Sequence, residues 1–227
     1  ATLVSYAAGW AIGVPLLVPP LNTAVAWVVM ARSLGRGQVV RAVAVMLVWA
    51  ATMAVASTTM SALGWSRSGG EDLFLQAAYR DDMLRWVRTG AGAESEPGVF
   101  LPRHAASTGV FLLTSLASGG LLSMPMGAML TNSMGEYVGA MAAESRRPWV
   151  SAILGWHPWA VLRVIGFVLL GVLLSAVLVC RVQRANYSLA RHRIWLASAG
   201  LLLLFDVGLK VLLAPTWAVL LRGVAGW

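Results

Sequence analysis

The sequence predicts an all-α polytopic membrane protein, a bundle of five or six transmembrane helices with a helical insert outside the membrane. Composition supports this, because hydrophobic residues make up 59% of the 227 residues, charged residues make up 11%, and the mean hydropathy is +0.75. The apolar residues also form runs of about 20 residues, the length that a helix needs to cross a bilayer. We therefore expect a single integral membrane domain over residues 1–227.

The first expected span, Leu3–Ala31, contains no charged residue but includes three prolines. Proline removes a backbone donor and clashes with the preceding turn, so Pro19 and Pro20 predict a kink or two half-helices. A break of this kind needs protein or a polar cavity beside it. Gly9 and Gly13 form a small-xxx-small face, which we expect to pack against another helix.

The later expected spans are apolar runs with few charges: Ala42–Leu63, Thr108–Leu130, Trp159–Cys180 and Ile194–Leu213. The tail 215–227 either extends the last helix or lies at the interface. Residues 131–139 are apolar but short. They fit a half-helix, a re-entrant piece or a continuation of the preceding span.

Residues 64–107 form the only long polar stretch. Charges alternate with apolar residues at helical spacing over Glu71–Arg88, which predicts an amphipathic helix, and Gly90–Gly98 predicts a loop. The stretch has five arginines against six acidic residues and no lysine. This balance is typical of the extracytoplasmic side, so we expect 64–107 to be an extracytoplasmic insert.

Two connections are rich in arginine, Arg32–Arg41 and Arg181–Arg193, and both favour the cytoplasm. Five crossings place them on opposite sides of the membrane. A sixth crossing between residues 131 and 157 places them on the same side, but that window contains charges that are costly in lipid. The sequence is compatible with both five and six crossings.

Three motifs in the second half carry a family resemblance. They are the glycine-rich Ser118–Pro125, the segment Asn132–Gly139, and Gly155–Arg163 with its His157-Pro-Trp159 step. Together, over about residues 40–215, they resemble the SpoIIM family (stage II sporulation protein M, DUF95), where a Pro-His-Gly motif stands at the last position. The resemblance implies a non-enzymatic membrane component that works inside a complex.

Charged and polar residues at membrane depth are the leading site candidates, because they are costly there and need a reason. Asp206 and Lys210 are four residues apart on one helix face and are expected to pair. Glu136 and Arg163 are expected to pair across the break, with Asn132 as a further hydrogen-bond partner. These residues fit either an inter-helix clamp or a transport pathway.

Glycines near these residues are candidates for close helix packing, because small residues let helix backbones approach in membranes. Gly135 and Gly139 are spaced for this role. A pair between Glu136 and Arg163 would in addition make the segment Gly135–Gly139 line a polar cavity.

Two histidines near span ends, His104 and His157, are possible axial ligands of haem or of a chlorophyll-type pigment. No spacing of histidine, cysteine and acidic residues indicates a metal centre, so no metal is predicted. Hydrolase elbows and nucleotide-binding loops are also absent from the sequence, which argues against an enzyme.

The favoured function is therefore a non-catalytic integral subunit, or a permease-like component, of a larger complex in the bacterial cytoplasmic membrane. The alternatives are a cofactor-bearing subunit of an electron-transfer or light-harvesting complex and an ABC-type exporter permease. Expected partners are the lipid bilayer and other membrane protein subunits. The basic residues lie in short clusters between spans, where lipid headgroups account for them, so nucleic acid is not an expected partner.

Overall fold

The computed structural model describes residues 4–6, 18–64 and 74–227, and the regular structure in these ranges is helical. The prediction of an all-α fold is confirmed. The helices of eight or more residues in this part are α2 (Val18–Gly35), α3 (Val39–Ala62), α4 (Phe74–Thr89), α5 (Pro97–Ser118), α6 (Ser123–Glu144), α7 (Pro148–Gly155), α8 (Pro158–Val182) and α9 (Arg193–Ala225).

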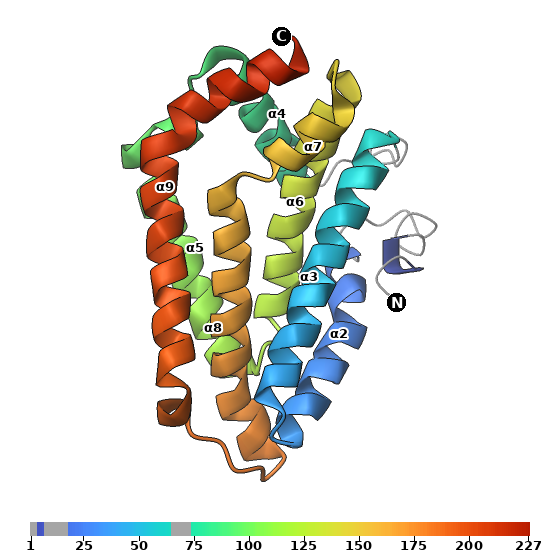
Figure 1. The fold of residues 1–227 in the computed structure, drawn as a ribbon. Coiled ribbons are helices and arrows are strands. Elements are labelled where there is room, and N and C mark those ends of the chain that lie inside the picture. The colour runs from blue at the N-terminus through green and yellow to red at the C-terminus, as the bar shows by residue number, and fades with distance from the viewer. Residues whose placement is uncertain (1–3, 7–17, 65–73) are drawn as a thin grey trace.

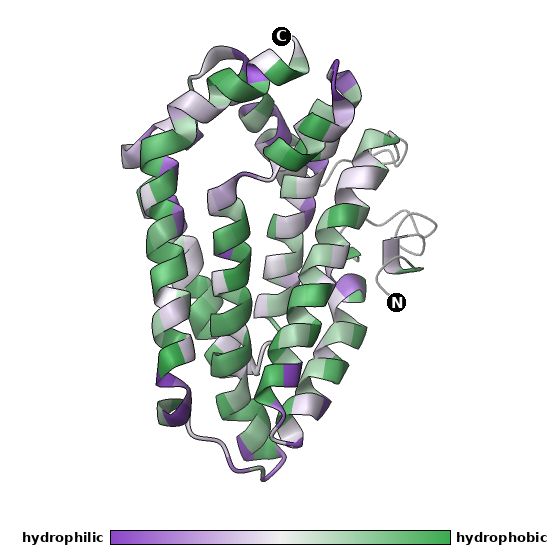
Figure 2. Ribbon diagram, viewed as in Figure 1, coloured by the Kyte–Doolittle hydropathy of each residue, from purple (hydrophilic) through white to green (hydrophobic). Residues whose placement is uncertain are grey.

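The long helices run side by side along one axis, while α4 and α7 lie at one end of the bundle (Figure 1). Within the described ranges, three helical segments are long and apolar enough to cross a membrane: Val39–Ala62, Pro158–Val182 and Leu189–Ala225. Hydrophobic residues predominate along most of the length of these helices (Figure 2). The chain is therefore an integral membrane protein.

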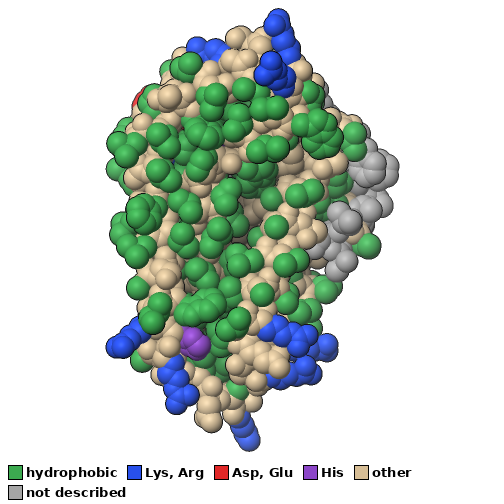
Figure 3. Space-filling view, viewed as in Figure 1, with side chains coloured by type: hydrophobic (Ala, Val, Ile, Leu, Met, Phe, Trp, Pro, Cys, Tyr) green, Lys and Arg blue, Asp and Glu red, His purple; other side chains and the backbone are tan. Residues whose placement is uncertain are grey.

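Both arginine-rich connections lie at the same end of the bundle, opposite α4 (Figure 1). We call this the arginine end, defined by the α2–α3 connection (36–38) and the α8–α9 connection (183–192). Arginine side chains gather there (Figure 3), and neither connection contains an acidic residue. We call the opposite end, with α4 and α7, the α4 end. Five crossings would place the two arginine-rich connections on opposite sides of the membrane. Because both lie at one end of the bundle, that conflict does not arise.

Of the three interpretations of residues 131–139, the continuation of the preceding helix is confirmed. These residues lie inside the continuous helix α6, and the chain turns earlier, between α5 and α6. Gly119 and Gly120 have φ angles of 60° and 89°, a left-handed conformation that ends helices and that glycine adopts without a steric penalty. The span predicted over Thr108–Leu130 is thus two antiparallel helices.

The proline pair lies at the edge of the described part of the chain. Pro19 and Pro20 belong to the first described turn of α2, and residues 7–17 before it lie outside the described residues. The kink or pair of half-helices expected at these prolines therefore stays a prediction. The predicted packing face of Gly9 and Gly13 lies outside the described residues.

Two other boundaries also differ from the predictions or refine them. Helix α9 continues through Pro215 and bends over the α4 end (Figure 1), so the tail extends the last helix. Helix α5 begins at Pro97, inside the stretch expected to be an extracytoplasmic insert. The amphipathic helix predicted there is α4.

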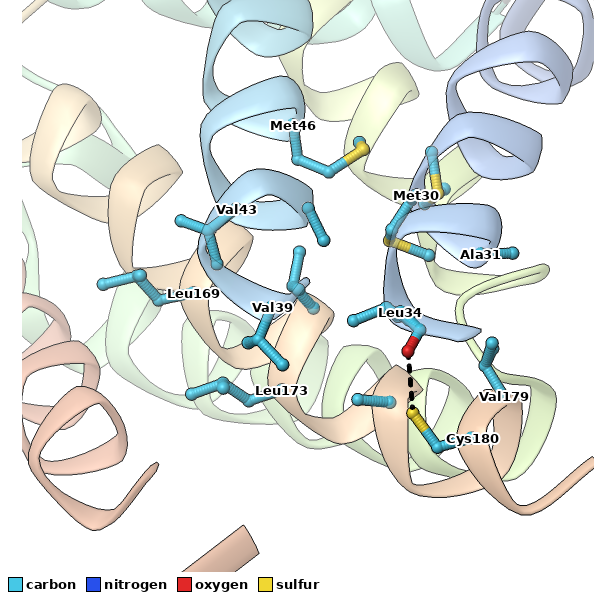
Figure 4. Close-up of a cluster of buried hydrophobic side chains, with 14 of the residues drawn as sticks. Met30, Ala31, Leu34, Val39, Val43, Met46, Leu169, Leu173, Val179 and Cys180 are labelled. Carbon is cyan, nitrogen blue, oxygen red and sulfur yellow. Dashed lines mark hydrogen bonds between the residues drawn. The ribbon is translucent and has the colours of Figure 1, made fainter. Parts of the chain in front are cut away.

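The buried hydrophobic residues of the described part of the chain form two clusters, one towards each end. The cluster towards the arginine end is mainly aliphatic and includes Leu34, Val43, Leu173 and Cys180. Figure 4 shows these side chains converging between α2, α3 and α8, with the Cys180 thiol against the Leu34 carbonyl oxygen at 3.4 Å. The other cluster is rich in aromatic residues and connects α4, α6, α8 and α9.

Candidate functional site

The charged residues predicted at membrane depth are all paired, but not with the predicted partners. Arg163 on α8 donates from Nε and Nη2 to both carboxylate oxygens of Asp206 on α9, at 2.8 Å each. Lys210 donates from Nζ to Glu94 Oε1 at 2.7 Å. Glu136 accepts from Arg80 Nη1 at 2.9 Å. The predicted pairs Asp206–Lys210 and Glu136–Arg163 are therefore wrong.

Chain segments at the α4 end supply the partners that sequence reasoning did not assign. Glu94 belongs to the short 3₁₀ helix η3 (Ala93–Ser95), and Arg80 belongs to α4. Both segments fold back onto the bundle instead of projecting from it. A buried charge needs a partner to offset the cost of desolvation, and these segments provide one for each of two membrane-depth charges.

His104 on α5 completes this group. Its Nε2 lies 3.5 Å from Asp206 Oδ2, and its ring stacks on Phe167 with 6.4 Å between centroids. We call the group formed by Glu94, His104, Arg163, Asp206 and Lys210 the ion cluster. Asp206 at its centre is 0% exposed.

Asn132 lies on α6, outside the ion cluster. Its side-chain oxygen accepts a hydrogen bond from the Tyr6 hydroxyl, and the residue is buried. Instead of the predicted role beside Glu136 and Arg163, Asn132 connects α6 to the N-terminal segment through this hydrogen bond.

Gly135 and Gly139 lie where α6 crosses α3. A Cβ atom at Gly135 would overlap the Ser57 side chain, and one at Gly139 would overlap the Thr58 carbonyl oxygen. Ser61 Oγ donates to the Glu136 carbonyl oxygen at 2.8 Å across the same contact. The two backbones therefore approach as closely as small residues permit, and this surface packs against α3 instead of lining a cavity.

His157, between α7 and α8, is enclosed by aromatic rings and only 1% exposed. It stacks on Trp159 with centroids 4.6 Å apart and meets Trp86 edge-on at 5.3 Å. Its Nε2 lies 3.3 Å from the Tyr137 hydroxyl. Burial, with Lys210 and Arg163 nearby, holds the pKa of His157 well below its usual range, so the ring is neutral.

Ligation of haem or a pigment would have to break an existing contact at either predicted histidine. Nε2 of His104 faces Asp206, and Nε2 of His157 faces Tyr137. In the part of the chain that the structure describes, no three histidine, cysteine or acidic residues are grouped to hold a metal ion. In this structure His157 packs among aromatic rings and His104 belongs to the ion cluster.

A cavity of about 350 Å³ lies beside the ion cluster. Residues of α2, α3, α5, α6 and α8 form most of its wall, and Tyr79 of α4 reaches it as well. Arg163 belongs to both the cavity wall and the ion cluster. The face shown in Figure 3 is hollowed between α3 and α8.

Sequence reasoning missed Tyr79, Arg80 and Glu94. The inward position of Tyr79 and Arg80 could have been predicted from helical spacing. These two residues precede the buried residues Met83 and Trp86 of α4 by one to two turns. These positions therefore share the inward side of an amphipathic helix. Glu94 lies outside any long helix and carries no such signal.

No protein-family model matches this chain, and neither the curated proteins nor the solved structures contain a match. The functional assignment therefore rests on the geometry of the cavity and the ion cluster.

Proposed function

We propose that this protein is a permease-like component of a bacterial cytoplasmic membrane, with α2, α3, α5, α6, α8 and α9 as six crossings. The observation that carries the proposal is the cavity of about 350 Å³ between α2, α3, α5, α6 and α8, which shares Arg163 with the buried ion cluster. Ionisable residues inside membrane bundles commonly face a substrate or ion pathway. The cavity and the cluster together supply both parts of such a pathway.

The arrangement of charge supports the six-crossing topology. The α2–α3 and α8–α9 connections contain no acidic residue, and they lie at one end of the bundle. An excess of arginine and lysine marks the cytoplasmic side of a membrane protein. We therefore assign the arginine end to the cytoplasm. Membership of the SpoIIM family and a place in a larger complex remain hypotheses.

Cysteine accessibility tests the proposal. Cys180 is the only cysteine, so Cys180→Ser gives a background for Ser133→Cys and Ser123→Cys in the cavity wall. The lipid-facing Leu204→Cys, at a position that is 70% exposed, is the control. Cysteine reacts as the thiolate, which forms in water and not in hydrocarbon.

A permease has to expose its cavity to water during transport. We expect a membrane-impermeant thiol reagent to label both cavity cysteines in native membranes and to leave Leu204→Cys unlabelled. Equal protection of all three cysteines would contradict the permease assignment and favour a purely structural subunit.

A further inference from the structure

The cavity is long and narrow. Its wall follows α8 from Ala160 to Ser175, a distance of about 22 Å at a helical rise of roughly 1.5 Å per residue. A volume of about 350 Å³ is near the small limit of ligand sites, which begin at roughly 300 Å³. This length and volume suit one extended hydrocarbon chain and are too small for a lipid with two chains.

The wall is apolar and adaptable. Five methionines contribute to it, together with aromatic rings from α3, α5, α7–α8 and α8. The methionines are Met30, Met46, Met124, Met129 and Met134. Flexible thioether side chains fit chains of irregular shape. Since the hollow between α3 and α8 opens on the outer face of the bundle (Figure 3), a chain can enter from the bilayer.

Two hydrogen-bond donors lie in the wall at the α4 end. Arg163 uses Nε and Nη2 for Asp206, and among the described residues its Nη1 has no hydrogen-bond partner. The Tyr79 hydroxyl donates to the sulfur of Met134 at 3.4 Å, and thioether sulfur is a weak acceptor. Burial raises the pKa of Tyr79 above its usual range, so the hydroxyl keeps its proton.

We propose that the cavity binds a single-chain lipid with a carboxyl head, a long-chain fatty acid. The two carboxyl oxygens accept from Arg163 Nη1 and the Tyr79 hydroxyl, and the chain extends along α8 towards Ser175. This assignment rests on the proposed function, for which it names the substrate class. A hydrocarbon without a head would leave both donors without a strong acceptor, which is costly in a buried site.

Direct binding tests the proposal. We would measure binding of radiolabelled oleate to the delipidated full-length protein in mild detergent. We expect one oleate per chain. Tyr79→Phe removes one donor to a carboxylate and is expected to weaken binding about tenfold. Val168→Phe places a ring in the cavity and is expected to abolish binding, whereas the matched Val48→Phe, at a 67% exposed position of α3, leaves it unchanged.

Competition identifies the ligand independently of these variants. Unlabelled oleic acid is expected to displace the probe, while oleyl alcohol and dioleoyl phosphatidylcholine are at least tenfold weaker. Equal displacement by the alcohol would overturn the carboxyl assignment, and equal displacement by the phospholipid would overturn the single-chain assignment. No saturable oleate binding would overturn the proposal even if the cavity cysteines are labelled. Oleate binding without labelling of the cavity cysteines would support the lipid site and contradict the permease assignment.

Discussion

The two halves of the bundle are stabilised in different ways. The cluster at the arginine end is mainly aliphatic, and its members include Leu34, Val43 and Leu173. At the α4 end, the core is built around large rings such as Trp86 and Trp159, and charged side chains pair beside it. Both halves bury apolar surface, but among the described residues only the α4 half also accommodates the cost of buried charge.

This difference distinguishes contacts that only hold the helices together from contacts that have a functional role. Van der Waals packing is one of the forces that hold helices together in a membrane, and it predominates at the arginine end. Buried ion pairs often add little net stability over apolar residues of similar volume. Their presence at one end, next to the cavity, is therefore best explained by a role in the cavity's function.

The largest expected effect comes from Asp206→Leu. The substitution leaves the Arg163 guanidinium and His104 without their acceptor. An uncompensated buried charge costs about 3–5 kcal/mol. We expect a corresponding loss in the free energy of unfolding, measured by denaturation in mild detergent.

The double variant Asp206→Leu with Arg163→Met is the matched control. Removing both charges removes the unpaired guanidinium, so most of the lost stability is expected to return. A double variant as unstable as the single one would show that the pair itself stabilises the α4 half. The contrast between the two halves would then not indicate function.

The next largest effect is expected for Gly139→Ala. A Cβ atom there meets the Thr58 carbonyl oxygen, which is backbone and cannot move aside. Overpacking of this kind costs about 1–3 kcal/mol. Gly109→Ala on α5 is the control, because a Cβ atom there has no neighbour within 4 Å.

In the helix interior of α5, alanine is favoured over glycine by roughly 0.5–1 kcal/mol, so Gly109→Ala is expected to be neutral or stabilising. Thermal unfolding of the two variants in the same detergent gives the comparison. If Gly139→Ala is as stable as Gly109→Ala, then α3 and α6 do not pack as closely as described.

A pH-dependent effect is expected at His157. Its pKa in the folded protein lies below the ordinary value of 6.5, so the unfolded state binds more protons as the pH falls below that value. Stability is therefore complete above about pH 6.5 and decreases on acidification towards the folded-state pKa. Each pH unit costs at most about 1.4 kcal/mol, which gives a loss of up to about 2 kcal/mol at pH 5.

Unfolding of the wild-type protein and of His157→Phe at pH 7.5 and pH 5 measures this effect. The variant is expected to lose the part of the pH dependence that comes from His157. If the two proteins respond equally to acid, the aromatic enclosure does not control the protonation of this residue.

The sequence predicts the apolar helices well and the polar contacts poorly. Length and hydropathy are local properties, so α3, α8 and α9 are close to the expected spans. The turn at Gly119 and Gly120 was missed, and one span was predicted over Thr108–Leu130, because a hairpin inside an apolar run produces no change in hydropathy. Its signal is the glycine pair alone.

The site could be predicted only in part, for a related reason. The sequence indicates that Arg163, Asp206 and Lys210 are costly at membrane depth, but not which residues offset that cost. Glu94 lies 116 positions before Lys210, on a polar stretch that composition assigns to the outside of the membrane. Pairing over such a separation depends on tertiary structure, which hydropathy does not contain.

The smallest expected effect is for Asp82→Ala. Asp82 pairs with Arg85 on the solvent side of α4, where the two side chains are 37% and 64% exposed. Exposed pairs contribute about 0.2–1 kcal/mol, and salt screens them. Arg80, on the same helix, instead reaches the nearly buried Glu136, and Arg80→Ala is expected to cost several times more. Equal effects of Asp82→Ala and Arg80→Ala in detergent unfolding would mean that burial does not distinguish the charges of the α4 end.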